Sequence, residues 1–92
     1  MNLVWSPLAR TQLLEAFSHI AEHDIDAATK VYARIEARAD SLIDFPELGH
    51  VGREIGTREL TITGTRYILV YRVMGDVIQI AAVWHGRQSR NE

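Results

Sequence analysis

The sequence predicts an α+β domain in which a two-helix hairpin packs on an antiparallel β-meander, with a short strand at the N-terminus. Apolar residues recur every three or four positions from Leu13 to Leu42, which is the period of helices that face a core. From Arg58 onward they alternate with polar residues, as in strands, and two glycine-led turns divide this region into three strands. A chain of 92 residues has the size of one domain, so we expect residues 1–92 to share one thin core.

The N-terminal elements are predicted from their composition and caps. NLVWS, residues 2–6, has the composition of a short strand. Ser6 and Pro7 then supply an N-cap followed by proline at the first helical position, so the first helix is expected to begin there. HDID at residues 23–26 interrupts the apolar stripe and ends this helix.

The second helix is predicted to begin within that interruption, capped by either Asp24 or Asp26. Phe45-Pro46 stops it, because the residue before a proline is disfavoured in helical conformation. PELGHVGREIG, residues 46–56, contains three glycines and a proline and is interpreted as a surface loop.

Two-residue turns at Gly64-Thr65 and Gly75-Asp76 predict how the three later strands pair. Counting outward from each turn gives the register directly. The first hairpin pairs Ile62 with Tyr67, Thr61 with Ile68, Leu60 with Leu69 and Glu59 with Val70. The second pairs Val73 with Ile78, Arg72 with Gln79, Tyr71 with Ile80, Val70 with Ala81, Leu69 with Ala82, Ile68 with Val83, Tyr67 with Trp84 and Arg66 with His85.

Cross-strand partners share a face of a sheet, so this register predicts two faces of different character. The face expected to meet the helices carries Leu60, Ile62, Tyr67, Leu69, Tyr71, Val73, Ile78, Ile80, Ala82 and Trp84. The other has an apolar centre of Ile68, Val70, Ala81 and Val83, with Arg66, Arg72 and His85 at its margins. An apolar strip of this kind needs cover. Either a terminal segment or a second copy covers it, or it is a site for an anionic or peptide partner centred on Arg66, His85 and Arg87.

Charge is unevenly distributed along the chain, whose net charge is −2. Residues 1–50 hold four Lys or Arg against eight acids, whereas residues 51–92 hold six Arg against four acids. Arginine is suited to bidentate contacts with phosphate or carboxylate, so an anionic partner for the second half is one interpretation. Solvated surface arginine is the other.

Several classes of protein are disfavoured by composition. The chain has no cysteine, which excludes disulfides and thiolate metal sites and is typical of a reducing compartment. No apolar run reaches the roughly 20 residues of a membrane helix, and no signal-like segment begins the chain, so a cytoplasmic location without membrane contact is expected. His19 and His23 lie four apart but have no evident third ligand, and we expect no metal and no cofactor.

Four segments together resemble the RelE/ParE superfamily of type II toxin–antitoxin toxins, and are closest to its ParE-like branch. They are VWSPLA at residues 4–9, DFPELGHVGRE at 44–54, GTRELTITGTRYILVYRV at 56–73 and VIQIAAVWHGRQ at 77–88. The resemblance implies a small bacterial toxin with this fold, bound and silenced by a cognate antitoxin in a toxin–antitoxin hetero-oligomer.

The resemblance leaves two targets open. ParE-like members poison DNA gyrase, whereas RelE-like members cut mRNA in the ribosome. RelE-like toxins use loop lysines, an arginine after the first tyrosine of the central strand, an arginine after the last strand and a tyrosine near the C-terminus. Only Arg87 matches this set, because the central-strand position is Ile68, no lysine follows Lys30 and no tyrosine follows Tyr71. The ParE-like function is therefore favoured, and whether the chain is an enzyme stays open.

The sequence thus predicts two sets of site residues. For contact with the target or partner, the set is Ile68, Val70, Arg72, Val83, His85, Arg87 and Arg90. For the ribonuclease alternative, His85 is the acid/base and Arg66, Arg72 and Arg87 hold phosphate, since histidine titrates near neutral pH. The expected partners are the antitoxin and DNA gyrase, or the ribosome and mRNA in the alternative.

Overall fold

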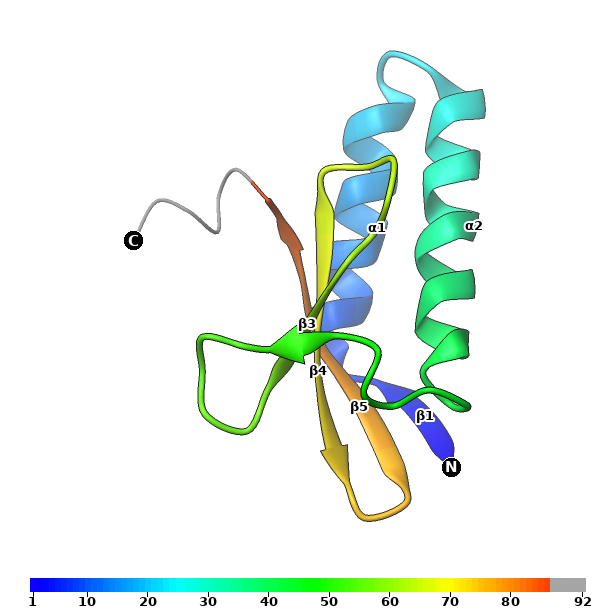
Figure 1. Cartoon of the computed structure of the whole chain (residues 1–92). Coiled ribbons are helices and arrows are strands. Elements are labelled where there is room, and N and C mark those ends of the chain that lie inside the picture. Colours follow the sequence, from blue (N-terminus) through cyan, green and yellow to red (C-terminus); the bar gives the residue numbers. More distant parts are fainter. Residues whose placement is uncertain (87–92) are drawn as a thin grey trace.

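The computed structural model describes residues 1–86 and confirms the α+β class, with two helices on one face of a five-stranded sheet (Figure 1). The elements are β1 (Asn2–Trp5), α1 (Pro7–Ala21), α2 (Ile25–Ser41), β2 (His50–Val51), β3 (Arg58–Thr61), β4 (Tyr67–Met74) and β5 (Val77–His85). The sheet order is β1-β5-β4-β3-β2. The predicted meander is β3-β4-β5. To it the structure adds β1, parallel to β5, and the short β2 within the segment interpreted as a loop.

The helices begin at predicted caps. The Ser6 side chain accepts a hydrogen bond from the Ala9 N–H, with Pro7 at the first helical position. Of the two aspartates proposed for the second cap, Asp24 fills the role and accepts from the Ala27 N–H at 3.0 Å. α2 ends at Ser41, before Phe45-Pro46.

Ser6 also joins the first strand and helix to β5. Its N–H donates to the Ile80 carbonyl at 2.9 Å, and its hydroxyl donates to the Ala81 carbonyl at 3.0 Å. Successive carbonyls of a regular strand point to opposite edges, so two neighbouring carbonyls can meet one residue only where the strand is irregular. β5 has a bulge at this point.

The bulge corrects the predicted register of the second hairpin. Pairing agrees with prediction from Val73–Ile78 to Tyr71–Ile80, but Val70 then pairs with Ala82, leaving Ala81 as the extra residue. Beyond Ala81, each residue of β4 pairs with the β5 residue one position later than predicted. A single inserted residue thereby exchanges the two faces of the strand. Trp84 therefore pairs with Ile68 and His85 with Tyr67. The first hairpin keeps its predicted register.

The core lies between the helices and one face of the sheet. Its largest fully buried side chains are Tyr71, Leu13, Ile35, Leu42, Ile62, Leu69, Ile78 and Ile80. Full burial of one aliphatic side chain of this size stabilises a fold by about 1.5–3 kcal/mol. Past the end of β1, the Gln12 side chain of α1 accepts from the Val83 N–H at 2.8 Å, so a helix side chain satisfies the edge of β5.

Tyr71 ties the loop after α2 to this core. Its hydroxyl accepts from the Gly49 N–H at 2.9 Å and donates to the Pro46 carbonyl at 2.8 Å. A Cβ at Gly49 would lie 2.9 Å from that hydroxyl and 2.8 Å from the Glu59 carbonyl oxygen, so only glycine fits. Burial raises the pKa of the Tyr71 hydroxyl, which keeps it protonated as the donor to Pro46.

Replacing Ser6 by alanine is expected to lower the free energy of unfolding by about 1–2 kcal/mol, because the helix loses its cap and the Ala81 carbonyl loses its donor. Urea denaturation followed by circular dichroism measures this. Ser18→Ala, on the exposed side of the same helix, is the matched control and should change stability much less. Equal effects of the two substitutions would contradict the special role of Ser6.

Candidate functional site

The candidate site is the sheet face that the helices leave uncovered. Residues 52–57, which connect β2 to β3, extend over this side of the sheet (Figure 1). Ile68, Arg72 and Trp84 are partly exposed on this face, whereas Val70 and Ala82 at its centre are buried. The strip expected to need an external cover is thus partly covered by the chain's own loop.

Arg53 closes the loop onto the sheet through Glu59. Its Nε donates to Glu59 Oε2 at 3.0 Å, its Nη2 donates to Oε1 at 3.2 Å, and its backbone N–H donates to Oε2 at 3.1 Å. The Glu59 side chain is only 4% exposed, so both oxygens need these donors. His50 Nε2 lies 3.9 Å from Oε1. The guanidinium of Arg53 also stands 5.0 Å from the centre of the Trp84 ring, at cation–π distance.

These contacts set the protonation of Glu59. Burial of the carboxylate acts to raise its pKa, but the hydrogen bonds from Arg53, together with the positive charge of Arg53 and His50, outweigh it. The net result is a lowered pKa. Glu59 is therefore a charged partner for Arg53 at neutral pH and is unsuited to act as a general acid there.

The loop itself is closely bonded. The Gly52 N–H donates to the Thr57 carbonyl at 2.8 Å, and both the N–H and the hydroxyl of Thr57 donate to the Glu54 carbonyl. Gly56 has φ of +82°, a conformation that L side chains rarely adopt. Ile55 at the tip is fully exposed.

The structure divides the predicted target-contact set. Ile68, Val70 and Arg72 lie on the uncovered face as predicted, although Val70 is only 2% exposed. Val83 was wrongly placed there. The bulge turns it toward the helices, where it is 5% exposed in the core. Arg87 and Arg90 lie outside the described residues.

His85 was also assigned to the wrong face. The displaced register pairs it with Tyr67, and the two rings meet edge to face with centroids 5.4 Å apart. The predicted partner, Arg66, instead accepts a backbone hydrogen bond from the Gly86 N–H. Arg66 and His85 thus lie at the same end of the sheet. They are not cross-strand partners, however, because His85 pairs with Tyr67, the residue that follows Arg66.

Sequence reasoning missed Arg53, Glu59 and Trp84 as members of one cluster. Glu59 alternates with Leu60 and pairs with Val70 as predicted, but alternation did not indicate that its charged side chain is buried. A signal was available, since an arginine and a glutamate flank a short glycine-containing loop and can meet when it folds back. The bulge that brings Trp84 to this face leaves no comparable mark.

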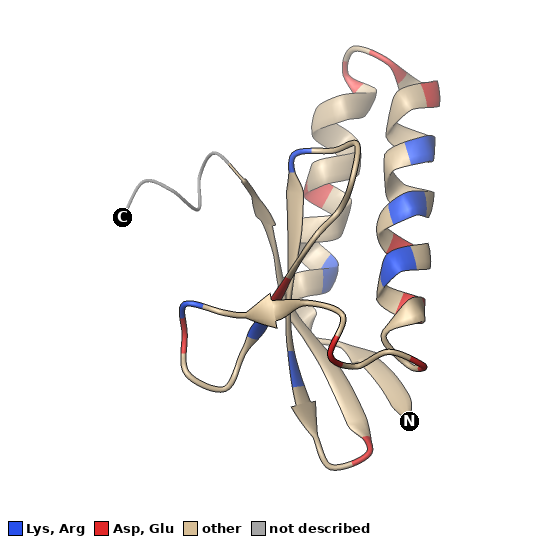
Figure 2. Ribbon diagram, in the orientation of Figure 1, with Lys and Arg blue, Asp and Glu red and all other residues tan. Residues whose placement is uncertain are grey.

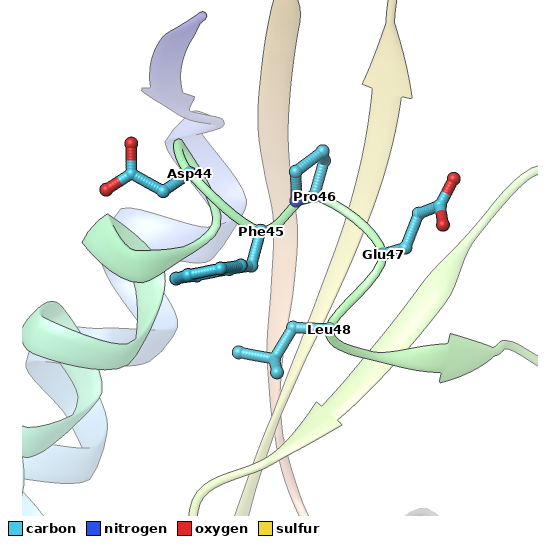
Figure 3. A pocket seen from close by; sticks show the side chains of 5 residues that line it. All are labelled: Asp44, Phe45, Pro46, Glu47 and Leu48. Atoms are coloured by element: carbon cyan, nitrogen blue, oxygen red, sulfur yellow. The ribbon is translucent and has the colours of Figure 1, made fainter.

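A second surface feature is a hollow of about 400 Å³ on the loop after α2, lined by Asp44, Phe45, Pro46, Glu47 and Leu48. The side chains of Phe45 and Leu48 project to one side of this loop, and the two carboxylates point away from them (Figure 3). Phe45 is 63% exposed, which is unusual for a phenylalanine. The hollow is therefore an apolar contact surface with acidic ends.

Within residues 1–86, no group of three or more histidine or acidic side chains is placed to hold a metal ion. No helix in the same range is long and apolar enough to cross a membrane.

Comparison with known proteins places these features in a family. Residues 3–90 match the family described as ParE toxin of type II toxin–antitoxin system, parDE. The chain is 39% identical over 84 residues to Y4kP of Sinorhizobium fredii, covering 91% of this chain and 86% of that protein. It is 33% identical over 75 residues to toxin RelE1 of Caulobacter vibrioides, covering 77% of each. A solved structure of the chromosomal ParDE toxin–antitoxin system from P. aeruginosa shares the fold, with a TM-score of 0.84, 24% identity and coverage of 92% of this chain and 95% of that one.

Arg53→Ala is expected to lower the free energy of unfolding at pH 7 by about 1–3 kcal/mol, because a buried carboxylate loses its donors. This loss is smaller than that expected for a fully buried ion pair, because the Arg53 side chain is 39% exposed and solvent screens its charge. Since Glu59 has a lowered pKa in the folded state, its contribution is full above the unfolded pKa and is lost as pH falls through the folded one.

The stability gap between parent and Arg53→Ala should therefore narrow as pH falls from 7 toward about 3. Urea titrations at several pH values measure the gap. Arg72→Ala is the matched control, because Arg72 makes no ion pair within the described residues. A gap that stays constant across this range would show that the ion pair does not stabilise the loop.

Proposed function

Because the chain belongs to the ParE toxin family of type II toxin–antitoxin systems, we propose that it arrests bacterial growth by poisoning DNA gyrase. A cognate antitoxin neutralises it by binding. In this proposal the chain acts by protein–protein contact and hydrolyses nothing.

The observation that carries the proposal is that the guanidinium of Arg53 is already bound to the Glu59 carboxylate. Cleavage of RNA by its own 2′-hydroxyl needs a base, an acid and cations that offset charge developing on phosphate. Arg53 is the cation of the loop at residues 52–57, and its Nε, Nη2 and backbone N–H are all directed at Glu59. A phosphate would have to compete with a buried carboxylate for this guanidinium.

The target-contact surface in this proposal is the part of the uncovered face next to the end of β5. Ile68 and Trp84 form a cross-strand pair there, and Arg72 lies farther along β4. Aromatic and arginine side chains dominate the energetics of protein interfaces. His85 lies on the opposite face and is left out of this surface. Arg87 and Arg90, outside the described residues, are kept in the proposed contact set from the sequence alone.

Antitoxin binding is proposed for other surfaces. The apolar hollow at residues 44–48 offers exposed Phe45 and Leu48 to an amphipathic segment. β1 is an edge strand, so its outer backbone edge can accept an added strand. The antitoxin and the gyrase target then use separate parts of the molecule.

One observation favours the ribosome-dependent endoribonuclease as a second candidate. The Gly86–Arg66 backbone hydrogen bond and the contact between the Tyr67 and His85 rings hold Arg66 and His85 at one end of the sheet. With Arg87, they would form the acid/base and the phosphate contacts. This candidate is weakened because Arg66 and His85 are not cross-strand partners.

The deciding experiment is induction of the chain alone in a bacterium, with pulse-labelling of DNA and protein synthesis over the first minutes. DNA synthesis should fall first, and purified chain should inhibit supercoiling by gyrase in vitro. Early arrest of protein synthesis, with loss of toxicity in Arg66→Gln, would instead favour the ribonuclease. Unchanged gyrase activity at micromolar chain would reject the proposed target.

Truncation after Gly86 tests the contribution of the C-terminal arginines. Val83 belongs to the core, so a cut before it would unfold the chain, whereas removal of residues 87–92 leaves all of β5. We expect the truncated chain to keep its circular dichroism spectrum and to lose most gyrase inhibition. Full inhibition by the truncated chain would remove Arg87 and Arg90 from the target surface.

A further inference from the structure

The loop at residues 52–57 carries an apolar side chain at its tip, on the side of the sheet away from the helices (Figure 1). Ile55 is fully exposed there. One exposed apolar residue is ordinary on a protein surface and by itself indicates no partner. Ile55 is distinguished by the bonds that fix the loop around it.

A tight turn sets the direction in which Ile55 projects. The Thr57 N–H donates to the Glu54 carbonyl at 3.1 Å, which closes a four-residue turn with Ile55 in its second position. Gly56 follows with φ of +82°, as the third position of a type II turn requires. The Thr57 hydroxyl donates to the same carbonyl at 2.7 Å, and the Gly52 N–H donates to the Thr57 carbonyl at 2.8 Å. The tip is therefore held in a defined backbone conformation.

Arg53 fastens the base of this turn to the sheet. Its Nε, Nη2 and backbone N–H donate to the buried carboxylate of Glu59, and its guanidinium stands 5.0 Å from the centre of the Trp84 ring. Ile55 is two residues from Arg53, so the tip lies next to the part of the face where Trp84 is partly exposed. A loop that is ordered before binding loses little conformational entropy when it binds. The loop can thus present Ile55 to another molecule without rearranging.

We propose that Ile55 is an anchor residue that inserts into an apolar pocket on the folded surface of the toxin's target protein. The inference rests on the proposed function, under which that target is DNA gyrase. The shape of the tip determines the kind of partner. A flexible peptide binds in a groove or along the edge of a sheet, whereas a projecting, preformed turn fits a pocket that is itself preformed. The antitoxin surfaces proposed above are a hollow and a sheet edge, so they leave this tip to the target.

Charge disfavours a nucleic acid as the partner of this tip. The loop carries charges of both signs, from Arg53 and Glu54 (Figure 2). Arg53 is bound to Glu59, whereas Glu54 is an exposed acid directly beside Ile55. Binding of nucleic acid depends on cations that neutralise phosphate, and an isoleucine side chain offers no hydrogen bond. Burial of apolar surface in a protein pocket is the contact that Ile55 can make.

The test compares Ile55→Ser with the parent chain. A side chain that buries nothing within the fold adds nothing to its stability, so urea denaturation should give the parental free energy of unfolding. The concentration of purified chain that half-inhibits gyrase supercoiling should rise about tenfold or more, as expected when an interface loses one buried aliphatic side chain. Growth arrest after induction should weaken in parallel. Ile25→Ser, the same change at an exposed isoleucine of α2, is the matched control and should leave inhibition within about twofold.

A second pair of variants tests whether the shape of the turn matters. Gly56 and Gly75 both have positive φ, and a Cβ at either would meet no atom within 4 Å, so alanine there strains only the backbone. Gly56→Ala should weaken gyrase inhibition about two- to tenfold, because the strain favours other conformations of the tip. Gly75→Ala, in the turn between β4 and β5, should leave inhibition within about twofold.

The outcomes distinguish the role of Ile55 from the identity of the target. Parental inhibition and growth arrest by Ile55→Ser, or equal weakening by Ile25→Ser, would overturn the role of Ile55 and leave gyrase as the target. If the parent arrests growth without inhibiting gyrase, the proposed target is wrong, and loss of growth arrest in Ile55→Ser still supports the anchor. Loss of copurification with the antitoxin, in place of loss of growth arrest, would assign the tip to the antitoxin and overturn the proposal. A parent chain that neither inhibits gyrase nor arrests growth would overturn both.

Discussion

The arrangement of this fold depends on the extra residue in β5 and on Ser6, which holds it. One serine ends β1, caps α1 and donates to two successive carbonyls of β5. The bulge at Ala81 then exchanges the two faces of the strand, so Val83 completes the core and Trp84 joins the opposite face. The composition of the candidate site follows from this one local irregularity, because a regular strand would bury Trp84 and expose Val83 and His85 beside Arg66.

The second constraint is the buried carboxylate of Glu59. A charge removed from water must be satisfied by donors, and Arg53 supplies three of them from a loop that would otherwise be free to leave the sheet. Structure and chemistry are linked here. The contact that closes the loop onto Glu59 also engages the guanidinium of Arg53. Arg53 is therefore less available to an added anion than a cation without a buried partner.

Charge is separated on the molecule more sharply than its net value indicates. The helical turn and the loop after α2 are acidic, whereas one side of α2 and the uncovered sheet face carry the cations (Figure 2). The net charge of −2 thus hides local excesses of cations and of acids on different parts of the domain.

The sequence alone determined the fold class, the Ser6 cap and the turns, and it narrowed the second cap to Asp24 or Asp26, because each depends on local chemistry that a few residues carry. Ser6-Pro7, Asp24, Gly64 and Gly75 act where they were expected, and both glycines in the turns have positive φ. The resemblance to the toxin family was also evident from the sequence. Only the tertiary structure decided which face carries Val83, Trp84 and His85, since a bulge arises from contacts between elements distant in sequence and has no local signature. It also decided that Glu59 is a buried ion-pair partner. Its burial depends on the position of the loop that carries Arg53, and the alternation of polar and apolar residues along β3 gives no information about that position.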